Sequence, residues 1–395
     1  MKIVQINSVC GIGSTGRIAV DISKILTENN IENYIFYGIG KSSYPLSQKT
    51  GNIIDLRFHQ VITRFFGFHG FSSACVTKKL INQLSEIKPD IVHLHNIHGF
   101  YLNINILFEY IKNNNIKTIW TLHDCWAFTG HCAYFDYANC NNWKTECSKC
   151  KNLKDYPVSW FFDKSKYQFN KKKEIFTGVK NLTLVTPSIW LKSLVKQSFL
   201  KEYPVEVINN GIDLEAFKPT ESNLRQKYEL QNKFVILGIC FTLEGRKGGR
   251  YLVELAEKLD ENYQLVILGL ETREKLPDNI IKLPKTSTPK ELAEIYSMAD
   301  VFVNPTLEDN FPTVNLESLA CGTPVITFNT GGSIESVDEK TGLVVEKGDI
   351  KGLVDAVLKL NENPINSDEC VNKAVGYYSK TDRYNDYIKI YQESS

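Results

Sequence analysis

The 395-residue sequence predicts an α/β protein with two doubly wound parallel sheets, and three observations lead to that fold class. Apolar runs of strand length alternate with helix-length segments, which is typical of parallel sheets covered by helices on both faces. These runs form two successive series. The polar stretch INNGIDLEAFKPTESN, residues 208–223, lies between the series and carries Asn-Gly and Lys-Pro turn signals. We therefore expect two domains joined near this stretch.

The first series predicts an N-terminal domain over residues 1–205, and the second predicts a C-terminal domain over residues 206–375. Strands of the first are expected at 2–9, 33–38, 90–96, 117–123 and 181–187. Strands of the second are expected at 233–241, 263–269, 279–284, 300–306 and 323–328. A tyrosine-rich helical segment, roughly 369–392, is expected to return to the first domain, with residues 376–395 packed on it.

Composition and charge narrow the class of protein. The net charge of +1 gives no general attraction to nucleic acid. No signal-peptide pattern precedes the first strand, and no apolar run has membrane-spanning length, so we expect a protein that is cytoplasmic or peripheral at the inner face of the membrane. In that setting ten cysteines indicate reduced thiols or a metal site rather than disulfides.

A glycine pattern follows the first predicted strand. Gly11, Gly13 and Gly16 form GxGxxG at the start of a helix, where backbone amides favour a phosphate. One interpretation is an NAD(P)-dependent oxidoreductase, but the acid expected after the second strand is absent from 34–38. A plain tight turn remains the other interpretation.

Two loops of the second domain combine charge with a helix start. Arg246 and Lys247 lie in a glycine-rich loop, which suits a diphosphate, although a solvated basic helix start fits the charges equally well. The stretch LEDNFPTVNLESLACGTPV carries Glu308 and Asp309 before a predicted helix and Glu317 one turn inside it. Acids near a helix N-terminus are often only capping groups. The first amides of this helix would belong to Thr313, Val314 and Asn315.

These motifs resemble one known family. LEDNFPTVNLESLACGTPV, with GGSIES and TGLVVEKGD behind it, is similar to the nucleotide-sugar-binding domain of retaining glycosyltransferases of the GT-B fold, in family four. NNGIDLEAFKP, the RKGG and GSTGR loops, VHLHNIHG and TLHDCWAFTGHC resemble bacterial members that build capsule, O-antigen or exopolysaccharide. The resemblance implies two Rossmann-like domains facing a central cleft, with the acceptor bound by the first and the donor by the second. A non-catalytic carbohydrate-binding relative is the alternative.

The resemblance also implies the chemistry. The enzyme would transfer a sugar, with retention and without a catalytic metal, from a nucleotide-sugar to an oligosaccharide or a polyprenyl-diphosphate-linked glycan. A UDP-sugar is favoured as donor, and GDP- and dTDP-sugars stay open. The sequence contains no Asp-x-Asp motif, so Lys247, Arg246 and helix dipoles would neutralise the leaving diphosphate.

Residue roles follow from the same resemblance. Glu317 would accept hydrogen bonds from the ribose, and Asp309, or Glu308 beside it, would contact the transferred sugar. Lys247 and the helix-start amides would hold the diphosphate, and the loop 13–16 would approach it. His123 matches a family histidine that touches the donor sugar near the reaction centre.

Three further clusters are candidate sites. His95 and His98 follow a strand and could lie on the acceptor side, or they could simply satisfy backbone groups. A structural zinc site and unliganded thiols are both consistent with Cys132, Cys140, Cys147 and Cys150. Aromatic and basic residues mix at 64–71 and at 143–173. Such surface suits an anionic membrane, or else the aromatics are buried beneath a solvated face.

Overall fold

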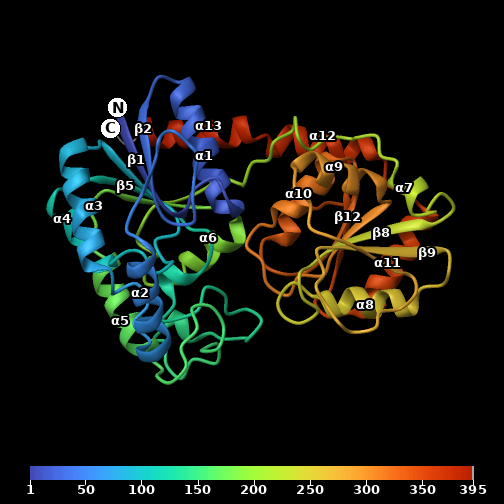
Figure 1. The fold of residues 1–395 in the computed structure, drawn as a ribbon, viewed down its shortest axis with the longest axis horizontal. Helices are drawn as coiled ribbons and strands as arrows, with labels where there is room; N and C mark the ends of the chain where they lie inside the picture. The colour runs from blue at the N-terminus through green and yellow to red at the C-terminus, as the bar shows by residue number, and fades with distance from the viewer. Residues whose placement is uncertain (394–395) are drawn as a thin grey trace. The chain divides into compact units, whose positions relative to one another are not determined.

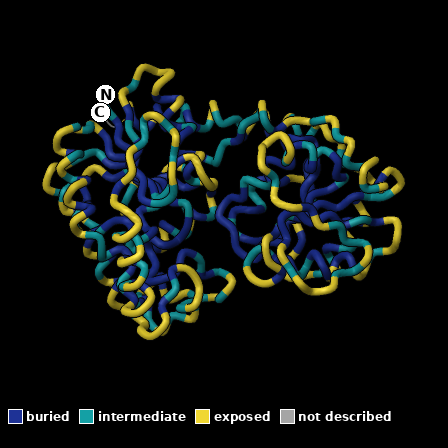
Figure 2. The backbone as a smooth tube through the Cα atoms, in the orientation of Figure 1, coloured by how far each residue is buried: buried dark blue, intermediate teal, exposed yellow. Residues whose placement is uncertain are grey.

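The computed structural model describes residues 1–393, which form two compact units (Figure 1). The first unit comprises Met1–Asn209 together with the chain from Tyr384 onward, and the second comprises Asn210–Arg383. Each unit has a sheet whose central strands are largely buried, and the exposed residues lie mainly in the loops and on the outer helix faces (Figure 2). The predicted fold class, two doubly wound parallel sheets, is confirmed.

The described part of the first unit contains a seven-stranded sheet of order β3-β2-β1-β4-β5-β6-β7, with every neighbouring pair parallel. Its strands are β1 (Lys2–Val9), β2 (Glu32–Ile39), β3 (Ser47–Lys49), β4 (Ile91–Leu94), β5 (Lys117–Thr121), β6 (Leu182–Thr186) and β7 (Val205–Val207). Alternate strand residues enter different cores. Ile3 packs with helices α1 and α13, whereas Val4 packs with α3, α4, α5 and α6.

The helices of this unit cover both faces of its sheet, as the two cores require. They are α1 (Gly13–Glu28), α2 (Ile53–Phe66), α3 (Ala74–Ile87), α4 (Ile104–Asn113), α5 (Ser165–Phe176), α6 (Ile189–Val195) and most of α13 (Lys380–Glu393). Single turns of 3-10 helix occur at Trp126–Phe128 and Asn142–Lys144.

The second unit has a six-stranded parallel sheet of order β10-β9-β8-β11-β12-β13 within the described residues. Its strands are β8 (Phe234–Ile239), β9 (Tyr263–Leu268), β10 (Ile280–Leu283), β11 (Val301–Asn304), β12 (Val325–Phe328) and β13 (Gly342–Val345). Helices α8 (Gly249–Lys258) and α11 (Ile350–Glu362) cover one face, and α9 (Pro289–Met298), α10 (Thr313–Ala320) and α12 (Ser367–Tyr378) cover the other. The short α7 (Leu224–Lys227) precedes β8, and a 3-10 turn spans Ser333–Ser336.

All ten predicted strands are present, with ends displaced by one or two residues. The apolar pattern did not reveal β3, β7 and β13, which are edge strands of only three or four residues. The prediction of one continuous C-terminal helix over 369–392 was wrong, because Ser379, with φ −55° and ψ 123°, leaves the helical conformation and separates α12 from α13. The cause is a long-range backbone pairing: Ile212 donates to the Tyr378 carbonyl at 2.8 Å and accepts from the Lys380 amide at 3.0 Å.

The C-terminal helix α13 completes the hydrogen bonding of a buried histidine. The Tyr391 hydroxyl lies 2.7 Å from Nδ1 of His93, and both side chains are inaccessible to solvent. The Thr121 hydroxyl lies 2.8 Å from the other ring nitrogen of His93 and 3.0 Å from the Tyr387 hydroxyl. The helix is therefore held to the first unit by polar contacts inside an apolar core.

We expect Tyr391→Phe to lower the melting temperature of the protein, because His93 would lose a buried hydrogen-bond partner at a cost of about 1–3 kcal/mol. Differential scanning fluorimetry measures the effect. Tyr377→Phe is the matched control, since Tyr377 is 65% exposed and should change the melting temperature little. Equal melting temperatures for the two variants would show that the Tyr391 contact contributes nothing to stability.

Candidate active site

The strand order places the candidate site at the carboxyl ends of the central strands of each sheet. In both units the order reverses beside the first strand, between β1 and β4 and between β8 and β11. Loops leaving the carboxyl ends of such neighbouring strands diverge, and the crevice between them is where ligands of open parallel sheets bind. The glycine loop and His95 follow β1 and β4, and the Arg246–Lys247 loop and Asp309 follow β8 and β11.

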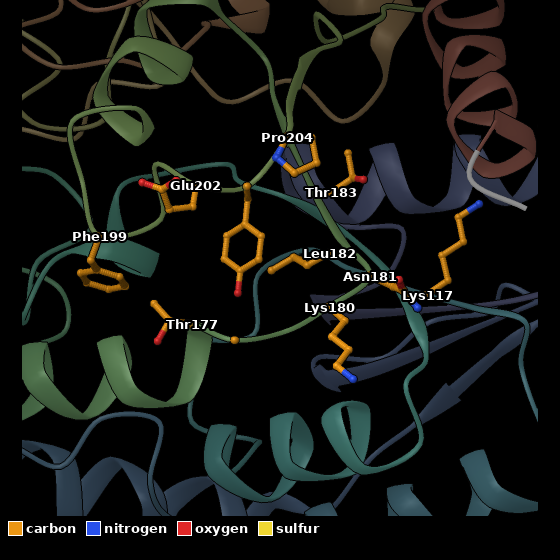
Figure 3. A pocket seen from close by; sticks show the side chains of 11 residues that line it. Lys117, Thr177, Lys180, Asn181, Leu182, Thr183, Phe199, Glu202 and Pro204 are labelled. Atoms are coloured by element: carbon orange, nitrogen blue, oxygen red, sulfur yellow. The ribbon is translucent and has the colours of Figure 1, made fainter.

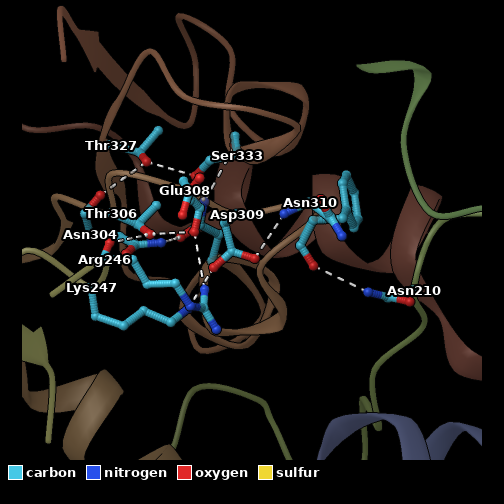
Figure 4. Close-up of polar contacts among 12 residues, drawn as sticks. Asn210, Arg246, Lys247, Asn304, Thr306, Glu308, Asp309, Asn310, Thr327 and Ser333 are labelled. Carbon is cyan, nitrogen blue, oxygen red and sulfur yellow. Dashed lines mark hydrogen bonds and ion pairs between the residues drawn. The ribbon is translucent and has the colours of Figure 1, made fainter. Parts of the chain in front are cut away.

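A lysine and an aspartate meet at the reversal in the second unit (Figure 4). Lys247 Nζ lies 2.5 Å from Asp309 Oδ2, and the Asn310 amide donates to Oδ1 at 3.0 Å. The Lys247 side chain is 41% exposed, whereas that of Asp309 is 11% exposed. An ion pair with a partly exposed lysine contributes only about 0–1 kcal/mol, so the ammonium can be shared with an incoming anion.

The backbone around this pair is fixed by a second set of contacts (Figure 4). The Arg246 carbonyl accepts from the Leu307 amide at 2.7 Å and from the Thr306 hydroxyl at 3.2 Å. The Arg246 guanidinium in turn donates to the Glu308 carbonyl at 3.1 Å. The two loops that carry the charges are therefore joined to each other. Sequence reasoning missed Thr306, because its hydroxyl follows the strand without any charge or motif.

Glycines allow the loops to approach this closely. A Cβ on Gly248 would lie 2.0 Å from the Pro305 carbonyl oxygen, and one on Gly331 would lie 1.9 Å from the Asp309 carbonyl oxygen. Both residues have positive φ, 71° and 54°, which side chains other than glycine rarely adopt. The RKGG and GGSIES loops are thus packed closely against the segment 305–309, which follows β11 and carries the two acids.

Helix α10 begins beside Asp309 without a capping side chain. Pro312 is its N-cap residue and makes no side-chain hydrogen bond to the first turn. The Asn315 amide, predicted to face the ligand, instead donates to the Pro312 carbonyl at 3.2 Å. The Asn315 side chain is buried, bridging Asn304 to Ser333 and Ser336. The positive end of α10 is therefore represented by Thr313 and Val314, both partly exposed.

Glu317 lies inside α10 and is only 5% exposed. The buried Tyr296 hydroxyl donates to its Oε2 at 3.2 Å. Burial and the neighbouring carboxylate raise the pKa of Tyr296 well above its usual value, so this hydroxyl stays a donor. Tyr296 orients the carboxylate, and the amphipathic pattern of α9 alone did not reveal that role.

In the first unit, the predicted histidines follow β4 and β5. His95 is 1% exposed, with Nε2 3.0 Å from Gln5 Oε1 and Nδ1 3.1 Å from Nε2 of His123. His123 is the more exposed of the two rings. His98 lies 2.9 Å from the Asp124 carboxylate and 3.1 Å from the Tyr156 hydroxyl. His95 thus stands behind His123 in the interior, rather than at a surface that an acceptor could reach directly.

The glycine loop of the first unit is a tight turn at the start of α1. Gly13 is exposed with φ 64°, whereas Gly16 is buried, and a Cβ on Gly16 would lie 3.1 Å from a Val9 methyl group. The Asn7 amide nitrogen donates to the Val9 and Thr15 carbonyls at 2.9 and 3.1 Å and so closes the turn. Asn7 was missed because a polar residue near the end of a strand carries no motif by itself.

The cysteine cluster shows contacts between thiols. A hydrogen bond with Cys150, and then burial, raise the pKa of Cys132 well above its usual value, and the Gly130 amide donates to Cys147 Sγ at 3.1 Å. Throughout residues 1–393, however, no group of three or more histidine, cysteine or acidic side chains is arranged to hold a metal ion. Zinc at Cys132, Cys140, Cys147 and Cys150 therefore stays a prediction.

Two hollows lie away from these residues. One, of about 600 Å³, is lined by Lys117, Leu182 and Pro204 at the amino-terminal ends of β5, β6 and β7 (Figure 3). The other, of about 880 Å³, includes Phe234 and Asp300, at the amino-terminal ends of β8 and β11. Both hollows therefore lie at the amino-terminal ends of the strands, whereas the charged and histidine side chains of the candidate site follow the carboxyl ends. Neither hollow contains a predicted site residue.

The fold and the site define a class, that of two-unit parallel α/β proteins with cations and a helix start at the carboxyl ends of their strands, the position at which open parallel sheets bind phosphorylated ligands. Comparison with known proteins identifies the family. The chain belongs to glycosyltransferase family 4, whose model matches residues 15–216, about half of the chain. The model described as glycosyl transferases group 1 matches residues 220–376. The protein is thus a glycosyltransferase, and the resemblance seen in its motifs is confirmed.

Relatives agree with this membership. The chain is 25% identical over 373 residues to the putative colanic acid biosynthesis glycosyl transferase WcaC of Escherichia coli K12, covering 90% of this chain and 89% of WcaC. It is 28% identical over 222 residues to an Escherichia coli UDP-Gal:alpha-D-GlcNAc-diphosphoundecaprenol alpha-1,3-galactosyltransferase, covering 50% of this chain and 56% of that enzyme. The crystal structure of Anabaena HepE in complex with UDP superposes with a TM-score of 0.70 at 13% identity, over all of both chains.

We expect Gly331→Ala to lower the melting temperature, because its left-handed backbone costs about 1–2 kcal/mol with a side chain and the new Cβ overlaps the Asp309 carbonyl. Gly376→Ala is the matched control. It lies in α12 with no heavy atom within 4 Å of a new Cβ, so it should stabilise the helix by roughly 0.5–1 kcal/mol. A Gly331→Ala protein as stable as Gly376→Ala would disprove the close approach.

Proposed function

We propose that the protein transfers a sugar from a nucleotide-sugar donor to a surface-glycan acceptor, with retention of anomeric configuration and without a catalytic metal. The observation that carries this proposal is the meeting of Lys247, Asp309 and the uncapped start of α10 at the carboxyl edge of the second sheet. A nucleoside diphosphate sugar needs a cation and amides for its phosphates and acids for its hydroxyls. That set of groups is present within one unit.

Each group has a proposed role. Lys247, Arg246 and the amides of Thr313 and Val314 bind the diphosphate, and Glu317 accepts from the ribose hydroxyls. Asp309 contacts the hydroxyls of the transferred sugar, and we favour it over Glu308 because its carboxylate lies directly beside the Lys247 ammonium. The second unit is accordingly the donor-binding domain, and the first, with His98, is the acceptor-binding domain. His123 of the first unit contacts the transferred sugar, and the loop at Gly13 and Gly16 approaches the diphosphate.

The proposed reaction proceeds on one face of the sugar. The bond between C1 and the diphosphate oxygen breaks, and the acceptor oxygen bonds to C1 from the same side. The acceptor proton passes to a departing phosphate oxygen, so no protein nucleophile is needed. Lys247 and Arg246 stabilise the charge that develops on the diphosphate, since the sequence offers no Asp-x-Asp motif to hold a metal there.

The donor and acceptor follow from the relatives. HepE was crystallised with UDP, and the galactosyltransferase relative is named for a UDP-sugar and a diphosphoundecaprenol-linked acceptor. We propose a UDP-sugar donor, with GDP- and dTDP-sugars as the alternatives, and a polyprenyl-diphosphate-linked or free oligosaccharide acceptor of a capsule or exopolysaccharide pathway. Product NMR tests the stereochemistry, because inversion at C1 would exclude the proposed same-face reaction.

Lys247→Ala is expected to lower transfer about 10²–10³-fold, as loss of a preorganised charge at a developing anion does. Glu317→Ala should weaken UDP binding, because a buried acceptor for the ribose is lost. Isothermal titration with UDP, and with NADH as a control ligand, measures binding. A radiolabelled-sugar assay measures transfer.

The control variant is Lys351→Ala, an 83% exposed lysine in α11 paired only with Asp355 among the contacts described, and it should transfer normally. Full activity of both Lys247→Ala and Glu317→Ala would exclude the proposed donor site. Binding of NADH in preference to UDP would favour the oxidoreductase instead.

We further propose that the first unit docks on an anionic membrane through α2 and the loop 156–162, here called the aromatic face. The only side chains that α2 buries are the polar His59 and Thr63, whereas Ile54 and Phe58 are 75% and 62% exposed. An apolar helix face turned outward indicates a binding surface. Within the described chain no helix is long and apolar enough to cross a membrane.

The loop extends the aromatic face and adds charge. Trp160 and Phe161 are 54% and 67% exposed and pack on Phe65 with ring centroids 5.1 and 5.6 Å away. The Arg64 guanidinium lies 5.7 Å from the Trp160 ring centroid, and Lys164 lies 5.9 Å from that of Phe162. Apolar rings with cations between them match a surface of anionic headgroups over acyl chains.

The aromatic face includes only part of the predicted aromatic and basic run from 143 to 173. Trp143 is 1% exposed and Lys172 is fully buried, so neither belongs to the aromatic face. Lys172 Nζ donates to the Trp126 and Thr129 carbonyls at 2.8 and 3.1 Å. Burial lowers the pKa of Lys172 to about 7. Its side chain is part of the protein interior and offers no charge to a membrane surface.

We expect the protein to sediment with phosphatidylglycerol vesicles and not with phosphatidylcholine vesicles, because anionic lipid adds attraction to the apolar contact. Trp160→Ser with Phe161→Ser should abolish sedimentation while leaving UDP binding intact. Val375→Ser, a 51% exposed apolar residue of α12, is the matched control. Unchanged sedimentation of the double variant, or a stable dimer that the double variant dissolves, would contradict membrane docking.

A further inference from the structure

Gln5, His95 and His123 are joined by hydrogen bonds in a chain that begins at a backbone carbonyl of α1. Gln5, fully buried in β1, donates from its amide nitrogen to the Ala19 carbonyl at 3.0 Å. Its oxygen faces Nε2 of His95 at 3.0 Å, and Nδ1 of His95 faces Nε2 of His123 at 3.1 Å. Every link lies within the first unit.

The direction of this chain follows from its first link. A backbone carbonyl can only accept, so the Gln5 nitrogen must face Ala19 and the Gln5 oxygen must face His95. An amide oxygen can only accept as well. Nε2 of His95 therefore carries a proton, and reversing the Gln5 amide would set two oxygens against each other beside Ala19.

The next link depends on His95 being neutral. Burial, and then the neighbouring His93 and His123, lower the pKa of His95 well below its usual value. The His93 ring lies 4.1 Å from the His95 ring, centroid to centroid, and it carries no negative charge that would stabilise a protonated His95. A neutral imidazole carries one proton, so Nδ1 of His95 is an acceptor. His123 must then donate from Nε2.

His123 itself is neutral at physiological pH. Burial is the largest influence and lowers its pKa to about 4, although Asp124 acts in the opposite direction. With its one proton held on Nε2, the ring has its lone pair on Nδ1. A group that the ring meets through Nδ1 must be a donor such as a hydroxyl, and not an unprotonated phosphate oxygen.

We infer that Gln5 and His95 are positioning residues that fix His123 as the Nε2-protonated tautomer, so that the ring accepts a hydrogen bond from a hydroxyl of the sugar. The second half of this inference rests on the proposed function, in which His123 contacts the transferred sugar. The first half concerns the ring alone. It is testable without any substrate.

The test is a long-range 1H–15N correlation spectrum of protein labelled with 15N-histidine, in which the two neutral tautomers give different nitrogen shifts. His123 and His95 are assigned by the signals that His123→Asn and His95→Asn remove. We expect both rings to be protonated on Nε2. A proton on Nδ1 of His123 would overturn the inference.

Two substitutions at His95 separate positioning from packing. His95→Asn can keep an oxygen acceptor towards His123, and it should preserve the His123 tautomer. His95→Leu removes that acceptor, and His123 should then populate both tautomers. Gln5→Met should likewise allow both tautomers in His95 and His123. A single unchanged tautomer in His95→Leu and Gln5→Met would also overturn the inference.

Kinetics connects the tautomer to transfer. His95→Leu should lower kcat about tenfold, the effect of losing one oriented hydrogen bond, while KM for the donor changes little. His95→Asn should retain most of the rate. Equal kcat values in the two variants would show that the tautomer does not serve the reaction. If the wild-type protein fails to transfer sugar while its spectrum shows the expected tautomers, the proposed function fails and the positioning stands.

Discussion

The reversal of strand order beside the first strand of each sheet is the constraint on which the rest of the structure depends. The loops that follow the carboxyl ends of β8 and β11 run in different directions there, and the crevice that forms between such loops is where ligands of open parallel sheets bind. The loops after these strands are packed closely, because Gly248 lies against the Pro305 carbonyl and Gly331 lies against the Asp309 carbonyl. This close packing brings the Lys247 side chain within reach of Asp309.

The two units solve different electrostatic problems with the same strand order. The second unit keeps an ammonium and a carboxylate at its edge, where a partly exposed pair costs little to separate. The first unit keeps neutral imidazoles, because burial lowers the pKa of His93 and His95 and so removes their charge. A diphosphate is suited to the charged edge, whereas hydroxyl groups are suited to the neutral one.

How far sequence predicts such a site depends on the range of each contact. The buried strands were predictable because continuous apolar runs identify them. The positions of Lys247 and Asp309 after β8 and β11, and of Glu317 inside α10, were predictable from the same pattern, whereas their roles stay predictions. The partners that orient such residues were not predictable. Tyr296 and Gln5 lie 21 and 90 residues from Glu317 and His95, and each resembles an ordinary core residue of its helix or strand. The split between α12 and α13 was equally hidden, since it arises from pairing with Ile212.

Long-range partners matter more at His123 than at Lys247, for a chemical reason. An ammonium has three protons and can donate in several directions, so a lysine such as Lys247 needs only to be near an anion to bind it. A neutral imidazole is a donor at one nitrogen and an acceptor at the other, so its usefulness depends on which nitrogen carries the proton. That choice is transmitted to His123 from the Ala19 carbonyl through Gln5 and His95. The interior of the first unit thereby determines the hydrogen-bonding character of a side chain at its edge.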